Sequence, residues 1–130
     1  KDDIVYTTEG RNVLRGITRA TVMYDLVPKL ELKCVEKNIE PYDVYTADEA
    51  FLTSTPFCLT PAVSLNGVPI GDGKPGKITQ LLLDTWSNMV GVDIVAQIKK
   101  WDASISVNDP NAPSPYQFKN PTLSMDIADK

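Results

Sequence analysis

A chain of 130 residues with 42% hydrophobic and 23% charged residues has the composition of one globular domain, which argues against a disordered or fibrous protein. The net charge of -4, without a basic stripe, argues against a nucleic-acid partner, because phosphate backbones are bound mainly through clustered Lys and Arg. The absence of histidine excludes Ser-His-Asp and His-based zinc chemistry within this sequence.

Two cysteines, Cys34 and Cys58, lack the spacing of a metal site or a disulfide framework, so we expect reduced thiols and no bound metal. The apolar runs are shorter than the roughly 18 residues that a membrane span needs. The N-terminus lacks the apolar region of a signal peptide. These features predict a cytoplasmic protein without a membrane partner.

The first 30 residues predict a strand followed by a helix. Residues 4–8 are β-rich and bounded by polar residues, which is typical of a strand. Apolar residues near helical spacing predict a helix over 17–30. Pro28 should end or kink this helix near Val27.

The middle of the chain predicts short elements. Residues 32–35 suggest a strand, and residues 41–47 a short helix with proline at its first position. Residues 50–52 are typical of a buried strand that runs into Thr53-Ser54-Thr55-Pro56. A further strand over 62–65 should end at an Asn-Gly hairpin turn.

The last third begins with a glycine-rich loop at 71–76, which lacks the Walker spacing and is better explained as a tight loop before a helix. Helical spacing then predicts helices over 78–89 and 94–101. After Asp102 the chain becomes rich in Pro, Asn and Ser, which predicts an extended tail over 105–130.

Two segments place hydroxyls and backbone N–H groups where an anion can bind. Gly16-Ile17-Thr18 begins the first predicted helix, and Ser54-Thr55 follows a predicted strand. A helix start carries partial positive charge, to which a hydroxyl adds a donor. Glycine and threonine also begin helices without any ligand, so these residues alone leave both interpretations open. Arg19 in the first turn gives mild support for a nearby anion.

Four blocks in a fixed order extend this pattern. They are Asn12-Val13-Leu14-Arg15-Gly16-Ile17-Thr18-Arg19, Ala47-Asp48-Glu49-Ala50-Phe51-Leu52-Thr53-Ser54-Thr55, Thr60-Pro61-Ala62-Val63 and Ile70-Gly71-Asp72-Gly73-Lys74-Pro75-Gly76. The chain resembles the C-terminal half of the class IV aminotransferases, the pyridoxal-phosphate enzymes of the branched-chain and D-amino-acid group. The resemblance implies an α/β (α+β) fold: the barrel-like large domain of that family, incomplete at its N-terminal side, over residues 1–104.

The resemblance also implies the roles of individual residues. Leu14 matches the leucine that packs against the pyridine ring of pyridoxal 5'-phosphate. The matched contacts to the cofactor phosphate and its surroundings are Gly16, Ile17, Thr18, Ser54 and Thr55. The matched substrate contacts are Thr55, Pro56 and Phe57.

Pro56 departs from the family pattern. The resemblance implies that the N–H groups of this turn face the substrate α-carboxylate, and proline has no N–H. A donor is therefore missing, and Phe57 and Cys58 would make the pocket more apolar.

The resemblance places the Schiff-base lysine and the glutamate partner of the pyridine nitrogen upstream of this sequence. We therefore expect a homodimeric transaminase of branched-chain type as the full-length protein, acting on an amino acid and a 2-oxo acid, with this chain inactive by itself. The alternatives are a D-amino-acid aminotransferase, an aminodeoxychorismate lyase-like enzyme, or a non-catalytic module that retains the phosphate-binding half.

Asp48 and Glu49 are adjacent carboxylates that elsewhere suggest acid and base catalysis. Neighbouring residues in a strand point to opposite faces, so a shared site is not expected. We interpret both as structural.

Overall fold

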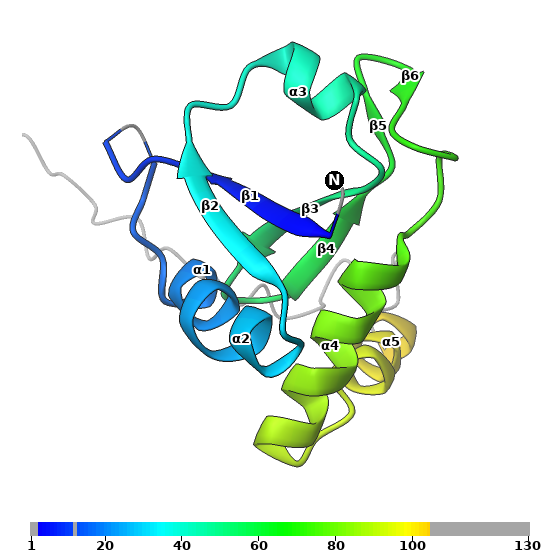
Figure 1. Cartoon of the computed structure of the whole chain (residues 1–130). Helices are drawn as coiled ribbons and strands as arrows, with labels where there is room; N and C mark the ends of the chain where they lie inside the picture. The colour runs from blue at the N-terminus through cyan, green and yellow to red at the C-terminus, as the bar shows by residue number, and fades with distance from the viewer. Residues whose placement is uncertain (1–2, 12, 105–130) are drawn as a thin grey trace, which may run out of the picture.

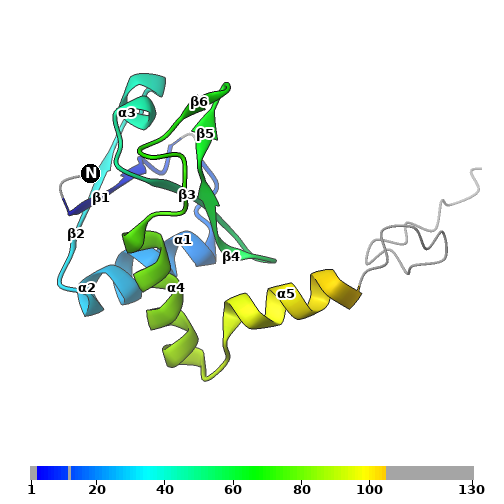
Figure 2. The ribbon, with the colours of Figure 1, turned by 90° about the vertical axis from the view of Figure 1, so that its right-hand side faces the viewer.

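The computed structural model describes residues 3–11 and 13–104 (Figure 1). Two pairs of strands face each other, with helices packed below them and one short helix above (Figures 1 and 2). The predicted tail over 105–130 lies outside the described residues and stays a prediction. No helix in the described part of the chain is long and apolar enough to cross a membrane.

The first strand pair joins β1 (Ile4–Thr8) and β2 (Lys33–Lys37) in parallel, with Ile4 opposite Lys33 and Thr8 opposite Lys37. Both strands were predicted, and the structure confirms them. Their parallel arrangement requires a crossover connection, which the helical segment between them provides.

That helical segment is a continuous run of α1 (Ile17–Thr21), the π-helix η1 (Val22–Leu26) and α2 (Val27–Lys29). The predicted helix is therefore confirmed, and it continues past Pro28 to Lys29. In the π-helical turn the Val27 N–H donates to the Val22 carbonyl, five residues earlier. The helix thus ends one residue after Pro28, close to the predicted position, and the π-helical turn lies directly before Val27 and Pro28.

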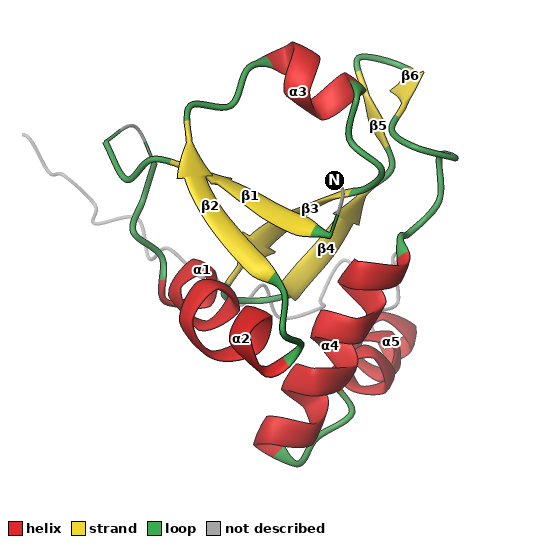
Figure 3. Ribbon diagram, viewed as in Figure 1, coloured by secondary structure: helices red, strands yellow, loops and turns green. Residues whose placement is uncertain are grey.

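The second strand pair is an antiparallel hairpin of β3 (Ala50–Ser54) and β4 (Cys58–Ala62), reached through α3 (Pro41–Tyr45). The predicted short helix is confirmed, with its end two residues earlier than expected. The interpretation of 50–52 as a buried strand was wrong in one respect, because Leu52 is 65% exposed. One edge of β3 pairs with β4, and Figure 3 shows how these two strands cross behind β1 and β2.

A small hairpin follows, in which β5 (Ser64–Leu65) and β6 (Val68–Pro69) flank the predicted Asn66-Gly67 turn. The turn is confirmed, since both of its residues have the positive φ that this hairpin needs. The strand expected over 62–65 is interrupted at Val63.

The predicted C-terminal helices are present as α4 (Lys77–Val90) and α5 (Ile94–Ser104), separated by Gly91 in the left-handed conformation. The core lies where the first helical run meets β4 and these two helices. Its buried members are Val22, Leu26, Val27, Leu59, Leu82, Leu83 and Ile94. The described strands form three two-stranded sheets and no closed barrel, in a mixed α/β arrangement.

Candidate functional site

The first predicted anion segment lies at the start of α1. Gly16 is the N-cap residue, with extended backbone geometry, and no side chain caps the helix there. The first N–H groups of a helix have no acceptor within the helix. The N–H groups of Ile17 and Thr18 therefore face outward at the positive end of the helix dipole.

Two large apolar side chains flank this helix start. Leu14 is 89% exposed and Ile17 is 86% exposed. A Cβ added at Gly16 would meet no atom within 4 Å, so open space adjoins all three residues. Exposed apolar side chains beside uncapped N–H groups indicate a surface that another group covers.

The second predicted segment is the turn of the β3–β4 hairpin. Ser54 pairs with Cys58, and residues 55–57 form the exposed tip, where Phe57 is 53% exposed. Cys58 takes a positive φ of 55°, which returns the chain into β4. Because α1 packs against β3, the structure brings the two segments to neighbouring elements. The convergence of Thr18 and Thr55 on one phosphate stays a prediction.

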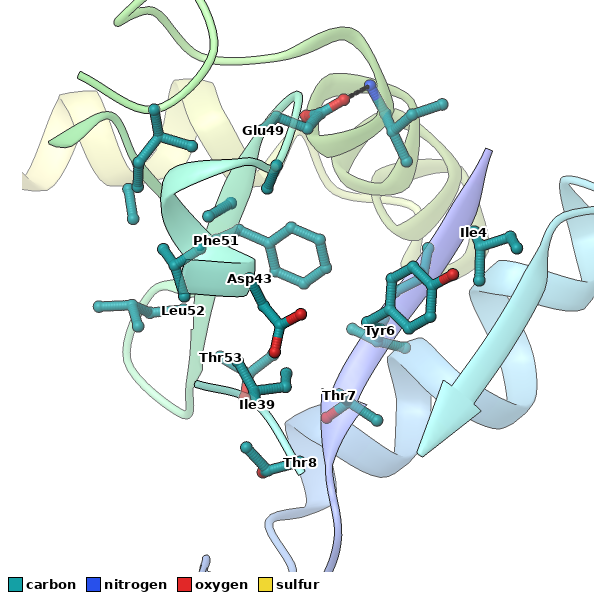
Figure 4. Close-up of a pocket in the computed structure, with 18 of the residues that line it drawn as sticks. Ile4, Tyr6, Thr7, Thr8, Ile39, Asp43, Glu49, Phe51, Leu52 and Thr53 are labelled. Atoms are coloured by element: carbon teal, nitrogen blue, oxygen red, sulfur yellow. Dashed lines mark hydrogen bonds between the residues drawn. The ribbon is translucent and has the colours of Figure 1, made fainter. Parts of the chain in front are cut away.

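A cavity of about 1260 Å³ lies between the two strand pairs, below α3. Figure 4 shows Tyr6 and Thr7 on one side of it and Phe51 and Thr53 on the other. Among the predicted site residues Leu14 lines this cavity, whereas the others lie outside its wall.

A charged pair that sequence reasoning did not single out lines the cavity. Lys37 Nζ donates a hydrogen bond to Asp43 Oδ1 at 2.8 Å and lies 5.0 Å from the centre of the Tyr6 ring. The hydrogen bond to Asp43 is the main cause that raises the pKa of Lys37 above its ordinary value of 10.5. Lys37 is therefore protonated near neutral pH and is not a nucleophile there.

Arg19 has a structural role in place of the expected support for a bound anion. Its guanidinium donates to the Thr7 hydroxyl at 3.0 Å, to the Thr8 carbonyl at 2.6 Å and to Glu36 at 2.7 Å. The anion beside Arg19 is thus the carboxylate of Glu36, which ties α1 to the ends of β1 and β2.

Glu49 is structural, as predicted, although it lies before β3 and not within a strand. Its carboxylate accepts hydrogen bonds from the Ile78 N–H at 2.8 Å, the Thr79 N–H at 2.9 Å and the Thr79 hydroxyl at 2.6 Å. Glu49 therefore caps the start of α4, although it lies about thirty residues earlier in the chain. No local sequence signal predicts this contact.

The glycine-rich loop at 71–76 packs closely against the segment that contains Glu49, which is consistent with the prediction of a tight loop before a helix. A Cβ at Gly76 would clash with the Glu49 side chain, and one at Gly71, where φ is +55°, would clash with the Asp48 carbonyl. These two glycines are needed for close approach to the Asp48-Glu49 segment.

Both cysteines are free thiols, and desolvation is the main cause that raises the pKa of each. A raised thiol pKa disfavours the thiolate, which is the reactive form. Neither cysteine is therefore activated as a nucleophile.

Comparison with known proteins identifies what this arrangement is similar to. Residues 1–65 match the amino-transferase class IV family. The branched-chain-amino-acid aminotransferase of Pseudomonas aeruginosa is 40% identical over 90 residues, covering 69% of this chain and 29% of that protein. The D-alanine aminotransferase of Listeria monocytogenes is 36% identical over 83 residues, covering 63% of this chain and 28% of that protein.

Solved structures of branched-chain amino acid aminotransferases are also similar to this chain. A branched-chain amino acid aminotransferase complexed with N-(5'-phosphopyridoxyl)-L-glutamate superposes with a TM-score of 0.64 at 28% identity, covering 70% of this chain and 31% of that one. The Escherichia coli branched-chain enzyme superposes with a TM-score of 0.61 at 28% identity, covering 70% of this chain and 29% of that one. The chain thus spans less than a third of the length of each of these relatives.

Proposed function

This chain belongs to the class IV aminotransferases, and from that premise we propose that it forms part of a pyridoxal-phosphate-dependent aminotransferase of branched-chain type. Residues 1–65 match the family. The whole protein would move an amino group between an amino acid and a 2-oxo acid. In this proposal the chain supplies contacts to the cofactor phosphate and to the substrate.

The observation that carries the proposal is the surface around Gly16. Leu14 and Ile17 are 89% and 86% exposed beside a helix start that no side chain caps. A flat ring with an anionic phosphate suits that surface, because it offers apolar contacts on one side and backbone donors on the other. The relative complexed with a phosphopyridoxyl group shares this fold.

The residues present fit the phosphate of that cofactor. Ile17 and Thr18 lie at the start of α1, where they offer two N–H groups and a hydroxyl. Ser54 ends the neighbouring β3 and Thr55 begins the turn after it, so each offers a hydroxyl. Several fixed donors around one site are what a dianion requires. When bound, pyridoxal phosphate supplies an electron sink for chemistry at the amino-bearing carbon. In the proposal this chain binds and orients that group and moves no proton.

The test is a chimera in which the matched 90 residues of the Pseudomonas aeruginosa relative are replaced by those of this chain. We expect the chimera to bind pyridoxal phosphate and to transfer the amino group of L-leucine to 2-oxoglutarate. A matched chimera that carries Thr18→Val and Thr55→Val should lose cofactor affinity. A folded chimera that binds no cofactor would overturn the proposal.

The substrate assignment depends on Pro56. A missing N–H at the turn should remove one charge-assisted hydrogen bond to a carboxylate, which is about 1.5 to 3 kcal/mol. We therefore expect Pro56→Ala in the chimera to raise kcat/KM for L-leucine and D-alanine, with no gain for an amine that lacks a carboxylate. Equal effects on all three donors would show that this N–H is irrelevant to recognition.

The branched-chain assignment is supported by the higher identity to the Pseudomonas enzyme than to the D-alanine enzyme. The proposal also includes a cytoplasmic homodimer as the whole protein. Exposed apolar side chains on several elements, including Tyr42 and Val68, support self-association. Sedimentation of the chimera measures this state directly, and a monomer would contradict it.

A further inference from the structure

The turn of the β5–β6 hairpin carries a chemical feature that the proposed function does not use. It consists of Asn66 and Gly67, the one place in the sequence where glycine follows asparagine. Asparagine is thermally labile, because the main-chain nitrogen of the next residue can attack its side-chain amide. Glycine in that next position has no Cβ to hinder the attack. The turn is therefore a candidate site of covalent modification.

The attacking nitrogen is accessible. The Gly67 N–H takes no part in the backbone hydrogen bonds of the turns and loops that the structure describes. Asn66 and Gly67 are both exposed, and a Cβ built at Gly67 would meet no atom within 4 Å. Water can therefore reach the peptide bond between the two residues.

The closed turn holds the reacting atoms apart. The φ angle is +51° at Asn66 and +80° at Gly67, as this type of hairpin turn requires. A residue in the left-handed conformation directs the next nitrogen away from its own Cβ. The Asn66 Nδ2 also donates a hydrogen bond to the Tyr45 hydroxyl at 3.1 Å, which holds the side chain against the end of α3 (Figures 1 and 2). The attack therefore requires the turn to open.

Opening of this turn does not require the domain to unfold. Each of the two strands has two residues, and Pro69 has no N–H to donate to its partner strand. A hairpin this short is marginally stable by itself, and Val68 is 50% exposed. The base of the hairpin is fixed, because Ile70 is buried and its N–H donates to the Val63 carbonyl at 3.0 Å. The tip can therefore open locally while the core stays intact.

We propose that Asn66 is a site of spontaneous deamidation, and that its hydrogen bond to Tyr45 limits the rate by keeping the hairpin closed. In the opened tip the Gly67 nitrogen loses its proton and forms a bond to Asn66 Cγ, and the Cγ–Nδ2 bond breaks. The leaving nitrogen takes up one proton and departs as ammonia. Water then opens the cyclic imide at Cγ, which gives aspartate, or at the main-chain carbonyl carbon, which gives isoaspartate. Nothing is oxidised or reduced.

The two products differ in their effect on the hairpin. Aspartate keeps the normal main chain, and the Tyr45 hydroxyl can donate a hydrogen bond to its carboxylate. Isoaspartate adds a methylene group to the main chain, which changes the length of a turn that fits its two strands only in one geometry. Formation of isoaspartate therefore releases the end of α3 from the β5–β6 hairpin. This modification is independent of cofactor binding and of amino-group transfer.

The experiment follows deamidation of the purified 130-residue chain by peptide mass spectrometry, with a synthetic peptide of residues 62–70 as the open reference. We expect the peptide to react at least about tenfold faster than the folded chain. Tyr45→Phe should accelerate the reaction in the folded chain about threefold or more, because it removes the hydrogen-bond acceptor. Tyr42→Phe is the matched control and should leave the rate unchanged, since Tyr42 lies on the same helix and is 74% exposed.

Equal rates in Tyr45→Phe and Tyr42→Phe would overturn the proposal, as would a folded chain that reacts as fast as the peptide or does not react at Asn66 at all. A series of urea concentrations below the unfolding midpoint tests the parent chain without any variant. We expect a nearly constant rate, because opening the tip exposes little surface. A rate that rises in parallel with the unfolded fraction would show that the reaction needs global unfolding, which also overturns the proposal. Asn38 and Asn88, which no glycine follows, report the background.

Discussion

Thr18 and Thr55 each contribute a hydroxyl to the proposed phosphate site, one from α1 and one from the tip of the β3–β4 hairpin. Replacing either with valine removes a hydrogen bond to a charged group, which contributes about 1.5 to 3 kcal/mol. We expect each change in the chimera to raise the dissociation constant of pyridoxal phosphate about tenfold or more. Fluorescence titration measures this constant.

Thr21 offers a matched control for that experiment. Its hydroxyl donates to the Ile17 carbonyl of its own helix at 3.1 Å and is one turn away from the helix start. Thr21→Val should therefore leave the cofactor affinity unchanged. A loss equal to that of Thr18→Val would show that the helix, and not the hydroxyl, determines binding.

Glu49 stabilises the fold through three hydrogen bonds at the start of α4. The acceptors and donors are partly buried, and Thr79 is 1% exposed. Removing the carboxylate leaves these donors without a partner, and each such group costs about 1 to 3 kcal/mol. We expect Glu49→Ala to lower the free energy of unfolding by about 3 kcal/mol, measured by urea titration.

Asp93 provides the comparison for Glu49. It lies in an exposed position directly before α5, and its carboxylate accepts a hydrogen bond from the Ala96 N–H at 2.8 Å. Asp93→Ala should cost about 1 kcal/mol, the usual value for an exposed helix cap. An equal loss in both variants would contradict the importance that we assign to burial of the Glu49 cap.

At the scale of elements, the Lys37–Asp43 pair joins β2 to α3 across the top of the cavity. The pKa of Lys37 is raised in the folded state, so its contribution to stability is fully present below pH 10.5 and is lost as the pH rises through the folded pKa. We expect the parent chain to lose more stability than Lys37→Met between about pH 9 and pH 12. Urea midpoints of both proteins across this range measure the difference.

Effects of pH that both proteins share cancel in the comparison, so the difference between their urea midpoints is the informative quantity. Lys33→Met on the same strand is the control, because the Lys33 side chain takes no part in the hydrogen bond between β2 and α3. If the parent and Lys37→Met change in parallel, the pair does not stabilise the contact between β2 and α3.

Local patterns predicted most elements because each signal is contained in the element itself. Residues 4–8 are β-rich, Pro41 opens α3, and Asn66-Gly67 closes a hairpin. Contacts between distant segments were not predicted. Glu49 caps a helix that begins about thirty residues later in the chain. The Arg19 guanidinium donates a hydrogen bond to the Glu36 carboxylate. Such pairs have no periodicity or spacing that a single sequence displays.

For the candidate site, too, local sequence signals were informative and contacts between distant segments were not. Leu14 is exposed and the helix start at Gly16 has no side-chain cap, while the ligand contacts that the sequence motif indicates for these residues stay predictions. The exposure of Leu52 does not follow from its apolar character, because neighbouring residues of a strand point to opposite faces and a face is buried only where another element packs against it. Burial depends on neighbouring elements, which composition does not specify.

At the scale of the whole molecule, we expect the purified 130-residue chain to show no transaminase activity. Amino-group transfer by pyridoxal phosphate needs a lysine that loses its proton readily. Lys37 lines the cavity, but its pairing with Asp43 raises its pKa and keeps it charged. The assay combines the chain with pyridoxal phosphate, 2-oxoglutarate and either L-leucine or D-alanine, with the chimera as the active control. Turnover above the rate of free cofactor would refute this prediction.

The π-helical turn at Val22–Leu26 affects how this chain should be aligned with other sequences. Its buried positions, Val22, Met23, Leu26 and Val27, repeat at intervals of four, while Tyr24 and Asp25 between them are exposed. The Val27 N–H bonds to a carbonyl five residues earlier, where an α-helix has four, so this turn contains one extra residue. The wide turn is thus equivalent to a single inserted residue whose register shift is absorbed locally. A one-residue gap at Tyr24 or Asp25 in an alignment is consistent with an unchanged buried face on both sides.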